Sequence, residues 1–350
     1  MVLECFYWLE INSMKIDNSF YMNLAINEAW RYQLLTYPNP AVGAVVLKNN
    51  QLISIGAHKT AGMPHAEVNA LKDAYLYFYP NSELKDLISS QDIHKFLLEN
   101  HNDFFNDCTI FVTLEPCNHI GKTPSCAMLL EQLKPKKVLI GMLDPNKKAS
   151  GGYDRLINAG IEVKTNILNK QCNDLLYPFK LWQKNRFKFF KIATRLDGTI
   201  SGGKISCKDS LIWNHTLRTK IDTMLIGGNT VRVDRPTLDA RYVEGKAPNI
   251  IIYSKQNQFD KSIPLFDIKN REVVISDNLN ILTNHNFIMI EGGYKLLNEL
   301  KDNIDMLVLI VSNSMKKVNC ISSNDLDIDF ELLYQYQIGT DTIKFLKVIK

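Results

Sequence analysis

Apolar residues in the first 165 positions follow two patterns, the 3.6-residue spacing of amphipathic helices and the short continuous runs of buried strands. Segments of the two kinds alternate along the chain, with Gly, Pro, Asn and Asp between them. Alternation of this kind indicates an α/β layered domain. The predicted helices cover 18–35, 66–71, 127–133 and 151–159, and the predicted strands cover 41–47, 52–57, 108–114, 137–142 and 161–163.

Residues 75–107 interrupt this alternation. Turn residues at 80–82 are followed by apolar residues at helical spacing. We interpret the segment as an inserted helical excursion that serves packing or a partner surface rather than chemistry. Its two histidines, His94 and His101, are expected to be solvated or structural.

The second half returns to the same alternation after a helical linker. The run 187–193 predicts a strand that stops at a turn formed by Arg195-Leu-Asp-Gly198. The other predicted strands cover 224–228, 250–253, 272–275, 287–290, 306–311 and 343–348, and the predicted helices cover 213–221 and 294–300.

Length and composition narrow the class of protein. A chain of 350 residues favours two domains, and 45% hydrophobic with 22% charged residues is typical of a globular protein. The net charge of +4 argues against a dedicated nucleic-acid binder and allows an anionic small substrate. No run approaches eighteen consecutive apolar residues, so we expect no membrane span.

The first residues and the cysteines bear on location. Residues 1–13 have no basic region and no small-residue cleavage site, so a signal peptide is not expected. We expect translation to start at Met14 and residues 1–13 to be an extension. The seven cysteines are odd in number and scattered, which fits a reducing cytoplasm better than a disulfide framework.

Two short stretches carry candidate chemistry, namely His65-Ala-Glu67 and Pro116-Cys117 followed by Cys126. This order of residues is the pattern of a zinc deaminase. One imidazole and two thiolates would hold Zn²⁺ and leave a fourth position for a water, whose pKa the metal lowers. Glu67 would take the proton of that water and deliver it to the departing amine.

The spacing of the two cysteines is unusual. Cys117 and Cys126 lie nine positions apart, whereas the commoner deaminase signature is Pro-Cys-x-x-Cys. The intervening residues must therefore form a loop that leaves the metal and returns, and Pro124 suits such a loop. Loops beside a catalytic metal often supply substrate contacts, and this one offers His119 and Lys122.

The second half contains no Gly-x-Gly-x-x-Gly after a predicted strand, so a standard Rossmann fingerprint is absent. A strand does run into Glu291-Gly-Gly293 and then a helix. Glycines there allow close backbone approach, and a helix N-terminus offers N–H groups to a phosphate. The same three residues also suit an ordinary turn, so both interpretations stay open.

The motifs of the first half resemble one family, the bifunctional riboflavin-biosynthesis deaminase/reductases. The resemblance rests on Asn39-Pro-Ala-Val-Gly43, His58, His65-Ala-Glu-Val68 and Thr113-Leu-Glu-Pro-Cys117 through Thr123-Pro-Ser-Cys126. The long Cys-to-Cys loop separates that family from cytidine and tRNA-adenosine deaminases. The resemblance implies zinc at His65, Cys117 and Cys126, proton transfer by Glu67, and substrate contacts at Asn39, His58, His119 and Lys122, with Lys122 on the substrate phosphate.

The second half resembles the reductase part of the same family, which is similar to dihydrofolate reductase in fold. Lys191-Ile-Ala-Thr-Arg-Leu-Asp-Gly198 is similar to its first motif, and His215-Thr-Leu-Arg218 and Glu291-Gly-Gly293 follow in order. The resemblance implies NADPH contacts at Ala193, Thr230, Asp234, Gly292 and Gly293, and substrate contacts at Arg218, Leu238, Arg241 and Glu291.

The resemblance thus implies an α/β fold class, with an N-terminal cytidine-deaminase-like three-layer domain and a C-terminal dihydrofolate-reductase-like α/β domain. The implied bounds are 14–165, a linker over 166–186, and 187–350. The cofactors would be one Zn²⁺ and NADPH. The reaction would be zinc-dependent deamination of 2,5-diamino-6-ribosylamino-4(3H)-pyrimidinone 5′-phosphate, then reduction to 5-amino-6-ribitylaminouracil 5′-phosphate. A homo-oligomer without nucleic-acid or membrane partners is expected.

The chain departs from the family at a few places. Ala44 stands where Cys is usual, the 75–107 insertion is longer than is common, and the stretch after Gly198 is shortened. In that stretch Lys204-Ile-Ser206 replaces a Trp-Ile-Ser/Thr element, and Gly202 replaces a serine.

Three alternatives remain open. The first is a deaminase with an inactive reductase half. A nucleic-acid-editing deaminase would favour a short Pro-Cys-x-x-Cys and a basic, aromatic-lined groove. A structural zinc module would carry four protein ligands.

Overall fold

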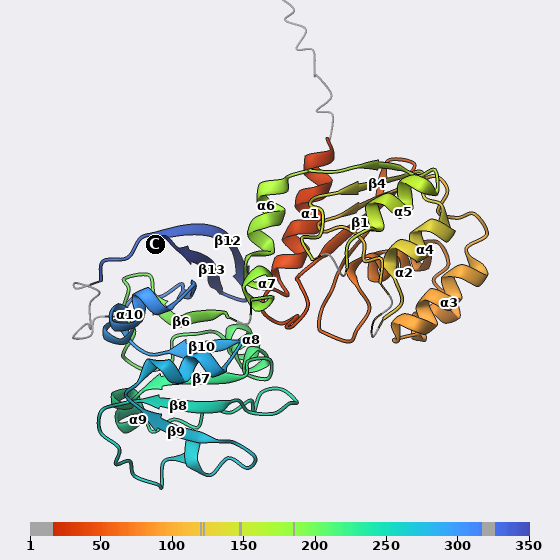
Figure 1. Cartoon of the computed structure of the whole chain (residues 1–350). Helices are drawn as coiled ribbons and strands as arrows, with labels where there is room; N and C mark the ends of the chain where they lie inside the picture. Colours follow the sequence, from red (N-terminus) through yellow and green to blue (C-terminus); the bar gives the residue numbers. More distant parts are fainter. Residues whose placement is uncertain (1–16, 120, 122, 147–148, 185, 317–325) are drawn as a thin grey trace, which may run out of the picture.

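The computed structural model describes residues 17–119, 121, 123–146, 149–184, 186–316 and 326–350. The described residues form two sheets, each with its own helices (Figure 1). The expected start at Met14 lies outside the described residues. Across the part of the chain that the structure describes, no helix is both long and apolar enough to cross a bilayer.

The first sheet has five strands in the order β2-β1-β3-β4-β5. The β1–β2 hairpin turns at Asn49 and Asn50, as predicted, and both residues have positive φ, which suits the tight turns of hairpins. β3 pairs antiparallel with β1 and parallel with β4. The strands are β1 Gly43–Lys48, β2 Gln51–Ala57, β3 Cys108–Val112, β4 Lys137–Ile140 and β5 Glu162–Lys164.

Helices cover both faces of this sheet. A Cβ added to Gly43 would lie 1.9 Å from the Ala25 carbonyl oxygen of α1, and one added to Gly56 would lie 2.5 Å from the Ala70 nitrogen of α2. Gly56 pairs with Ala44, so the two glycines point to opposite faces. The result is the predicted three-layer arrangement. The helices are α1 Asn18–Trp30, α2 Ala66–Phe78, α3 Ser90–Asn100, α4 Cys126–Leu133 and α5 Gly152–Asn158, with a 3₁₀ turn η1 Glu83–Asp86.

Several predicted bounds in this half were wrong. Helix α1 ends at Trp30 rather than at residue 35, because the chain turns and Leu34 adopts a left-handed φ of 70°. Helix α2 runs on to Phe78 and takes up the start of the 75–107 segment. The rest of that segment contains the 3₁₀ turn η1, helix α3 and turns, and His94 is buried on α3.

The second sheet has eight strands in the order β12-β13-β11-β6-β10-β7-β8-β9. From β11 to β9 all neighbours are parallel, and β13 and β12 add an antiparallel edge. The strands are β6 Lys188–Arg195, β7 Thr223–Gly227, β8 Asn249–Tyr253, β9 Val273–Ser276, β10 Ile288–Glu291, β11 Met306–Ser312, β12 Phe330–Ile338 and β13 Asp341–Val348.

The helices of this half include one that the pattern did not predict, the polar and short α9. The edge strand β12 was also missed, because none of its residues is fully buried. β6 continues to Arg195, for which the sequence predicts a turn. The helices are α6 Asn169–Leu175, α7 Tyr177–Trp182, α8 Lys208–Arg218, α9 Gly228–Asp234 and α10 Tyr294–Leu300, with 3₁₀ turns η2 Pro264–Phe266, η3 Leu279–Asn284 and η4 Lys301–Asn303.

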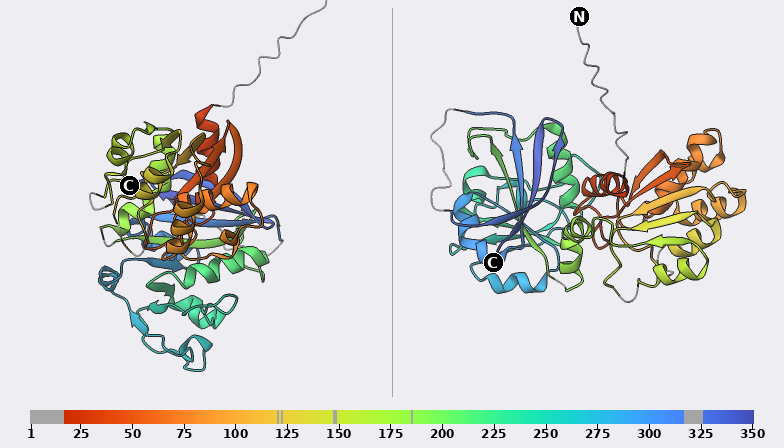
Figure 2. Two further views of the ribbon diagram at one scale, coloured as in Figure 1. Left: turned by 90° about the vertical axis from the view of Figure 1, so that its right-hand side faces the viewer. Right: turned by 90° about the horizontal axis from the view of Figure 1, so that it is seen from above.

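The two halves meet at α1, α6 and α7 and lie side by side when seen from above (Figure 2). Trp30 of α1 stacks on Tyr334 of β12, with ring centroids 5.0 Å apart and planes inclined by 6°. The Tyr334 hydroxyl also donates to the Asn27 side-chain oxygen at 2.7 Å. Lys220 donates to the Thr60 hydroxyl at 2.9 Å, so the second half touches the loop that leads to His65.

Candidate active sites in the two halves

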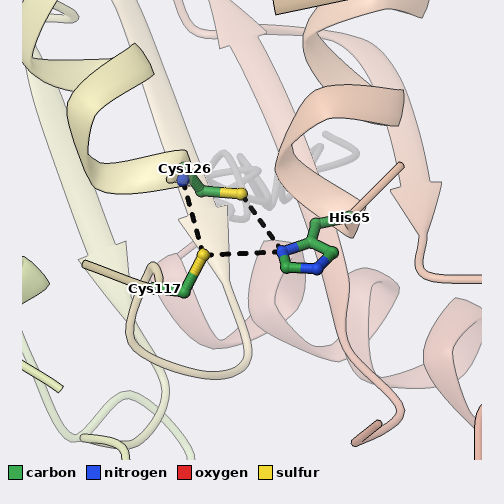
Figure 3. Close-up of side chains that lie close together, drawn as sticks. All are labelled: His65, Cys117 and Cys126. Carbon is green, nitrogen blue, oxygen red and sulfur yellow. Dashed lines mark hydrogen bonds between the residues drawn. The ribbon is translucent and has the colours of Figure 1, made fainter. Parts of the chain in front are cut away.

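The three predicted metal ligands converge from three elements. His65 is the N-cap of α2, Cys117 follows β3, and Cys126 is the first residue of α4. His65 Nδ1 lies 3.6 Å from Cys117 Sγ and 3.4 Å from Cys126 Sγ (Figure 3), and the three ligand atoms lie within 4.8 Å of one another. Tetrahedral zinc, with bonds of about 2.1 Å to nitrogen and 2.3 Å to sulfur, separates such ligands by roughly 3.6 Å. The donor set and its spacing therefore fit one zinc ion.

A buried carboxylate fixes the chain beside Cys117. Glu115 accepts hydrogen bonds from the backbone N–H groups of Asp144, Gly151 and Tyr153, each at 2.9 Å. These bonds join the end of β3 to the loop after β4 and to the start of α5. Sequence reasoning quoted Glu115 only as part of a motif and missed this role.

Glu67 lies in the first turn of α2 with 4% of its surface exposed. Burial, reinforced by the charge of Cys117, raises the pKa of the Glu67 carboxyl to about 7. A carboxyl with such a pKa can accept and return a proton near neutral pH. A hydrogen bond from Cys126 partly opposes this increase in the pKa of Glu67. Glu67 therefore lies next to the predicted metal ligands.

The two thiols differ in protonation. The hydrogen bond from the Cys126 thiol lowers the pKa of Cys117, and the same bond together with burial raises the pKa of Cys126. The Cys126 backbone N–H also donates to Cys117 Sγ at 3.4 Å. Burial lowers the pKa of His65, but its hydrogen bond to Cys117 and the thiolate charge outweigh burial, and the net shift is upward. Thiolate character at Cys117 suits a metal ligand.

Two of the predicted substrate residues lie next to this centre. His58 Nδ1 lies 3.1 Å from the Pro64 carbonyl oxygen, so it carries the ring proton, and Nε2 accepts from the Asn39 amide at 3.1 Å. Burial, and then the charge of His65, lower the pKa of His58 to about 4, so the ring is neutral at pH 7. The His58 and His65 ring centroids are 5.2 Å apart.

The long loop between the two cysteines is described only in part. His119 is exposed on it, and Lys122 lies outside the described residues. Sequence reasoning missed Thr123, whose Oγ1 lies 3.2 Å from His65 Nε2. Its place three residues before a ligand was the available signal.

In the second half, an ion cluster forms at the carboxyl edge of parallel strands. Glu291 at the end of β10 lies 3.1 Å from Lys191 Nζ of β6 and 3.1 Å from an Arg218 guanidinium nitrogen of α8. The three side chains are between 10% and 13% exposed. Burial would raise the pKa of Glu291, but the two cations outweigh it and lower the pKa to about 2. Lys191 was not among the predicted site residues.

The other predicted substrate residues of this half gather around Arg218. Its second guanidinium nitrogen donates to the Asp239 carbonyl oxygen at 3.1 Å, and the Asp239 carboxylate accepts from Arg241 at 2.8 Å. Leu238 next to them is buried, with a left-handed φ of 55°. Arg271, which the sequence did not suggest, holds this loop by donating to the carbonyl oxygen of Leu238 and, at 2.8 Å, to that of Thr237.

The predicted NADPH residues are only partly brought together. Cβ atoms added to Gly227 and Gly292 would lie 3.5 and 2.6 Å from Leu296, so the β7–α9 and β10–α10 junctions lie side by side. Thr230 Oγ1 would be 3.8 Å from the Cβ at Gly227. The missing Cβ at Gly292 makes room for the Leu296 side chain, so this glycine lets α10 pack closely at the end of β10. Asp234 is exposed at the C-terminal end of α9, about one helical turn from Thr230.

A buried arginine side chain holds the shortened stretch after Gly198 through hydrogen bonds. Arg195 is 1% exposed, and its guanidinium donates to the carbonyl oxygens of Ser201 at 2.5 Å, Gly202 at 3.4 Å and Lys204 at 3.3 Å. The residues that differ from the family pattern thus form a loop fixed on a buried cation.

The fold and the metal centre define a zinc-dependent deaminase half joined to a reductase-like α/β half. The family described as cytidine and deoxycytidylate deaminase zinc-binding region matches residues 15–142, and the RibD C-terminal domain family matches residues 187–312. The chain belongs to the RibD family of riboflavin biosynthesis proteins.

Three relatives illustrate the similarity. Riboflavin biosynthesis protein RibD of Aquifex aeolicus is 33% identical over 270 residues, which cover 75% of this chain and 68% of that protein. RibD of Synechocystis sp. is 32% identical, with 66% of this chain and 58% of that protein covered. The crystal structure of a diaminohydroxyphosphoribosylaminopyrimidine deaminase/5-amino-6-(5-phosphoribosylamino)uracil reductase from Thermotoga maritima is similar at a TM-score of 0.63 and 27% identity, covering 95% of this chain and 98% of that one.

These findings confirm the predicted family and fold class. They also confirm zinc as cofactor of the first half, since the matched family is a zinc-binding region and a His-Cys-Cys set is present. Membership of the second half in the RibD C-terminal family supports NADPH as the other cofactor. The domain bounds and the roles of individual site residues stay predictions.

Proposed function

We propose that the chain catalyses two successive steps of riboflavin biosynthesis on one phosphorylated substrate. The first releases ammonia from 2,5-diamino-6-ribosylamino-4(3H)-pyrimidinone 5′-phosphate. The second uses NADPH to reduce the ribosyl group and gives 5-amino-6-ribitylaminouracil 5′-phosphate. The observation that carries the proposal is the His65, Cys117 and Cys126 set with the buried Glu67 carboxyl beside it.

In the first step, zinc held by His65, Cys117 and Cys126 supplies a polarised water when it is bound. Glu67 accepts a proton from that water and returns it to the departing amine, and its raised pKa suits both transfers. The neutral His58 and the Asn39 amide bonded to it orient the pyrimidinone ring. His119 and Lys122 contact the substrate, with Lys122 on the phosphate.

In the second step, Arg218, Leu238, Arg241 and Glu291 hold the deaminated intermediate. Arg218 is locked between Glu291 and the Asp239 backbone, which pre-orients a cation for an anionic substrate. Ala193, Thr230, Asp234, Gly292 and Gly293 line the NADPH site. NADPH supplies the hydride for C1′ of the opened ribose.

The proposed deaminase domain covers 14–165 and the reductase domain covers 187–350, joined by a linker over 166–186. The aromatic contacts between the halves support a fixed arrangement within the chain. A cytoplasmic homo-oligomer that acts on a small molecule, not on nucleic acid, completes the proposal.

A second candidate is a deaminase whose reductase half is inactive. The specific observation in its favour is Arg195, which fills the interior of the shortened loop at the reductase site.

One assay separates the candidates. Purified, zinc-loaded protein is given the diaminopyrimidinone substrate and NADPH, and ammonia release and NADPH oxidation are recorded separately, with Glu67→Gln as the matched variant. The proposal expects both signals from the wild type and neither from the variant. Ammonia without NADPH oxidation would favour the second candidate. No ammonia from zinc-loaded protein would contradict both.

A further inference from the structure

We propose that Thr123 is a positioning residue of the metal centre, and that the returning arm of the long loop, residues 123–126, orients all three ligands. The inference deepens the proposed function and rests on the zinc site. It assigns a task to the nine-residue spacing of the cysteines other than the substrate contacts expected of that loop.

The orientation of His65 carries the argument. Its Nδ1 faces both thiols, at 3.6 Å from Cys117 Sγ and 3.4 Å from Cys126 Sγ. In the zinc-loaded protein, Nδ1 would offer its lone pair to the metal in place of the hydrogen bond to Cys117, and the single proton of the neutral ring would reside on Nε2. An imidazole ligand of this kind needs an acceptor for its second nitrogen.

Thr123 provides that acceptor. Its Oγ1 lies 3.2 Å from His65 Nε2, and only 9% of the residue is exposed, so solvent has little access to replace it. A hydrogen bond to the second ring nitrogen of a metal-bound histidine fixes both its tautomer and the orientation of its ring.

The same arm also orients Cys117. The Ser125 hydroxyl donates to the Cys117 carbonyl oxygen at 2.7 Å, and the Cys126 backbone N–H donates to Cys117 Sγ at 3.4 Å. Four consecutive residues thus contribute one ligand and contact the other two. The loop leaves the centre after Cys117 and returns with the groups that hold His65 and Cys117 in place.

The test compares Thr123→Val, which keeps the shape and removes the hydroxyl, with Thr123→Ser, which keeps the hydroxyl. Zinc affinity is measured by competition with a chromophoric chelator. We expect Thr123→Val to bind zinc about 10- to 100-fold more weakly than the wild type. Thr123→Ser should stay within about threefold, since it retains the hydrogen-bond acceptor. Cobalt-substituted protein should show altered d–d bands in Thr123→Val and wild-type bands in Thr123→Ser.

A third measurement needs no substitution. Long-range ¹H–¹⁵N spectra of the zinc-loaded wild type should show the His65 proton on Nε2. A proton on Nδ1 would overturn the proposal even if Thr123→Val failed to fold. Unchanged zinc affinity and cobalt bands in Thr123→Val would also overturn it, as would equal losses in both variants.

These readouts use the metal alone. A protein that shows the expected zinc dependence on Thr123 but releases no ammonia would contradict the proposed deamination and leave the role of Thr123 standing.

Discussion

The two candidate sites use buried charge in opposite ways. In the first half, burial and a thiolate neighbour raise the pKa of Glu67 to about 7, so its charge can change in the neutral range. In the second half, Lys191 and Arg218 lower the pKa of Glu291 to about 2, so its charge is fixed. A carboxyl such as Glu67 can therefore exchange protons near neutral pH, whereas Glu291 stays charged and pairs with two cations.

The largest effect that should separate the halves is that of metal removal. Dialysis against a chelator should lower ammonia release by roughly 10³-fold or more, because the polarised water is lost. NADPH oxidation with the deaminated intermediate supplied directly should stay within about twofold, since no metal-ligating cluster of three or more side chains occurs among the described residues of the second half. Reloading with zinc is the control. Loss of both activities would break the comparison.

Glu291→Gln should lower the stability and the activity of the second half without affecting the first half. It leaves Lys191 and Arg218 largely buried without their shared carboxylate, which should lower the free energy of unfolding by about 3 kcal/mol. Urea unfolding measures this change, and NADPH oxidation should fall while ammonia release persists. Glu272→Gln, the same replacement at an exposed position, is the matched control and should change stability by less than about 0.5 kcal/mol. Equal effects of the two variants would contradict a fixed-charge role for Glu291.

The same cluster predicts a pH dependence. The Glu291 pKa falls from 4.5 to about 2 on folding, so the carboxylate stabilises the folded chain fully above about pH 4.5. This contribution, about 3 kcal/mol, should disappear as the pH falls from about 4.5 towards 2. The difference in free energy of unfolding between wild type and Glu291→Gln should therefore be constant from about pH 5 to about pH 7. It should shrink below that range. A gap that grows on acidification would have the wrong sign.

Glu115→Gln should have a smaller and more local effect in the first half. The glutamine carbonyl oxygen can keep the bonds from Gly151 and Tyr153, so the NH₂ group faces the Asp144 backbone N–H, which costs about 1–3 kcal/mol for a buried group. Hydrogen exchange of the Asp144 amide should accelerate, while the Lys191–Glu291 region stays protected. Unchanged exchange at the Asp144 amide would show that Glu115 does not hold this loop.

The smallest predicted effect concerns the contact between the halves. A double-mutant cycle that combines Trp30→Ala with Tyr334→Ala should give a coupling energy of about 0.5–1.5 kcal/mol, as stacked aromatic rings do. A second cycle uses Tyr334→Phe in place of Tyr334→Ala. Tyr334→Phe keeps the ring and removes only the hydroxyl bond to Asn27. Zero coupling would mean that the two halves fold without this contact.

The three proposed metal ligands could be recognised in the sequence because they lie in short motifs with strong chemistry. His65, Cys117 and Cys126 meet in the structure, and Glu67 is buried beside them. The helix predicted over 294–300 has the observed bounds, because two glycines precede it and its apolar spacing is regular. Such features are local, and local features can be recognised in a single sequence.

The features that were missed depend on contacts between distant segments. Thr123 and Glu115 lie in motifs of the sequence, but their hydrogen-bond partners are 58 and 29 to 38 positions away along the chain, and no local pattern identifies those partners. Arg195 suggested a turn, but it is the last residue of β6, and its side chain donates hydrogen bonds to carbonyl groups of the loop that follows. Strand β12 presents mixed residues because it lies at the edge of its sheet, where partial exposure weakens the pattern.

Two separate sites acting in series should be separable by supplying the substrate of each site to a single variant. Glu67→Gln is given NADPH with either the diaminopyrimidinone substrate or the deaminated intermediate. The account predicts NADPH oxidation at the wild-type rate with the intermediate and none with the diaminopyrimidinone. NADPH oxidation with the diaminopyrimidinone, or none with the intermediate that the wild type reduces, would contradict it.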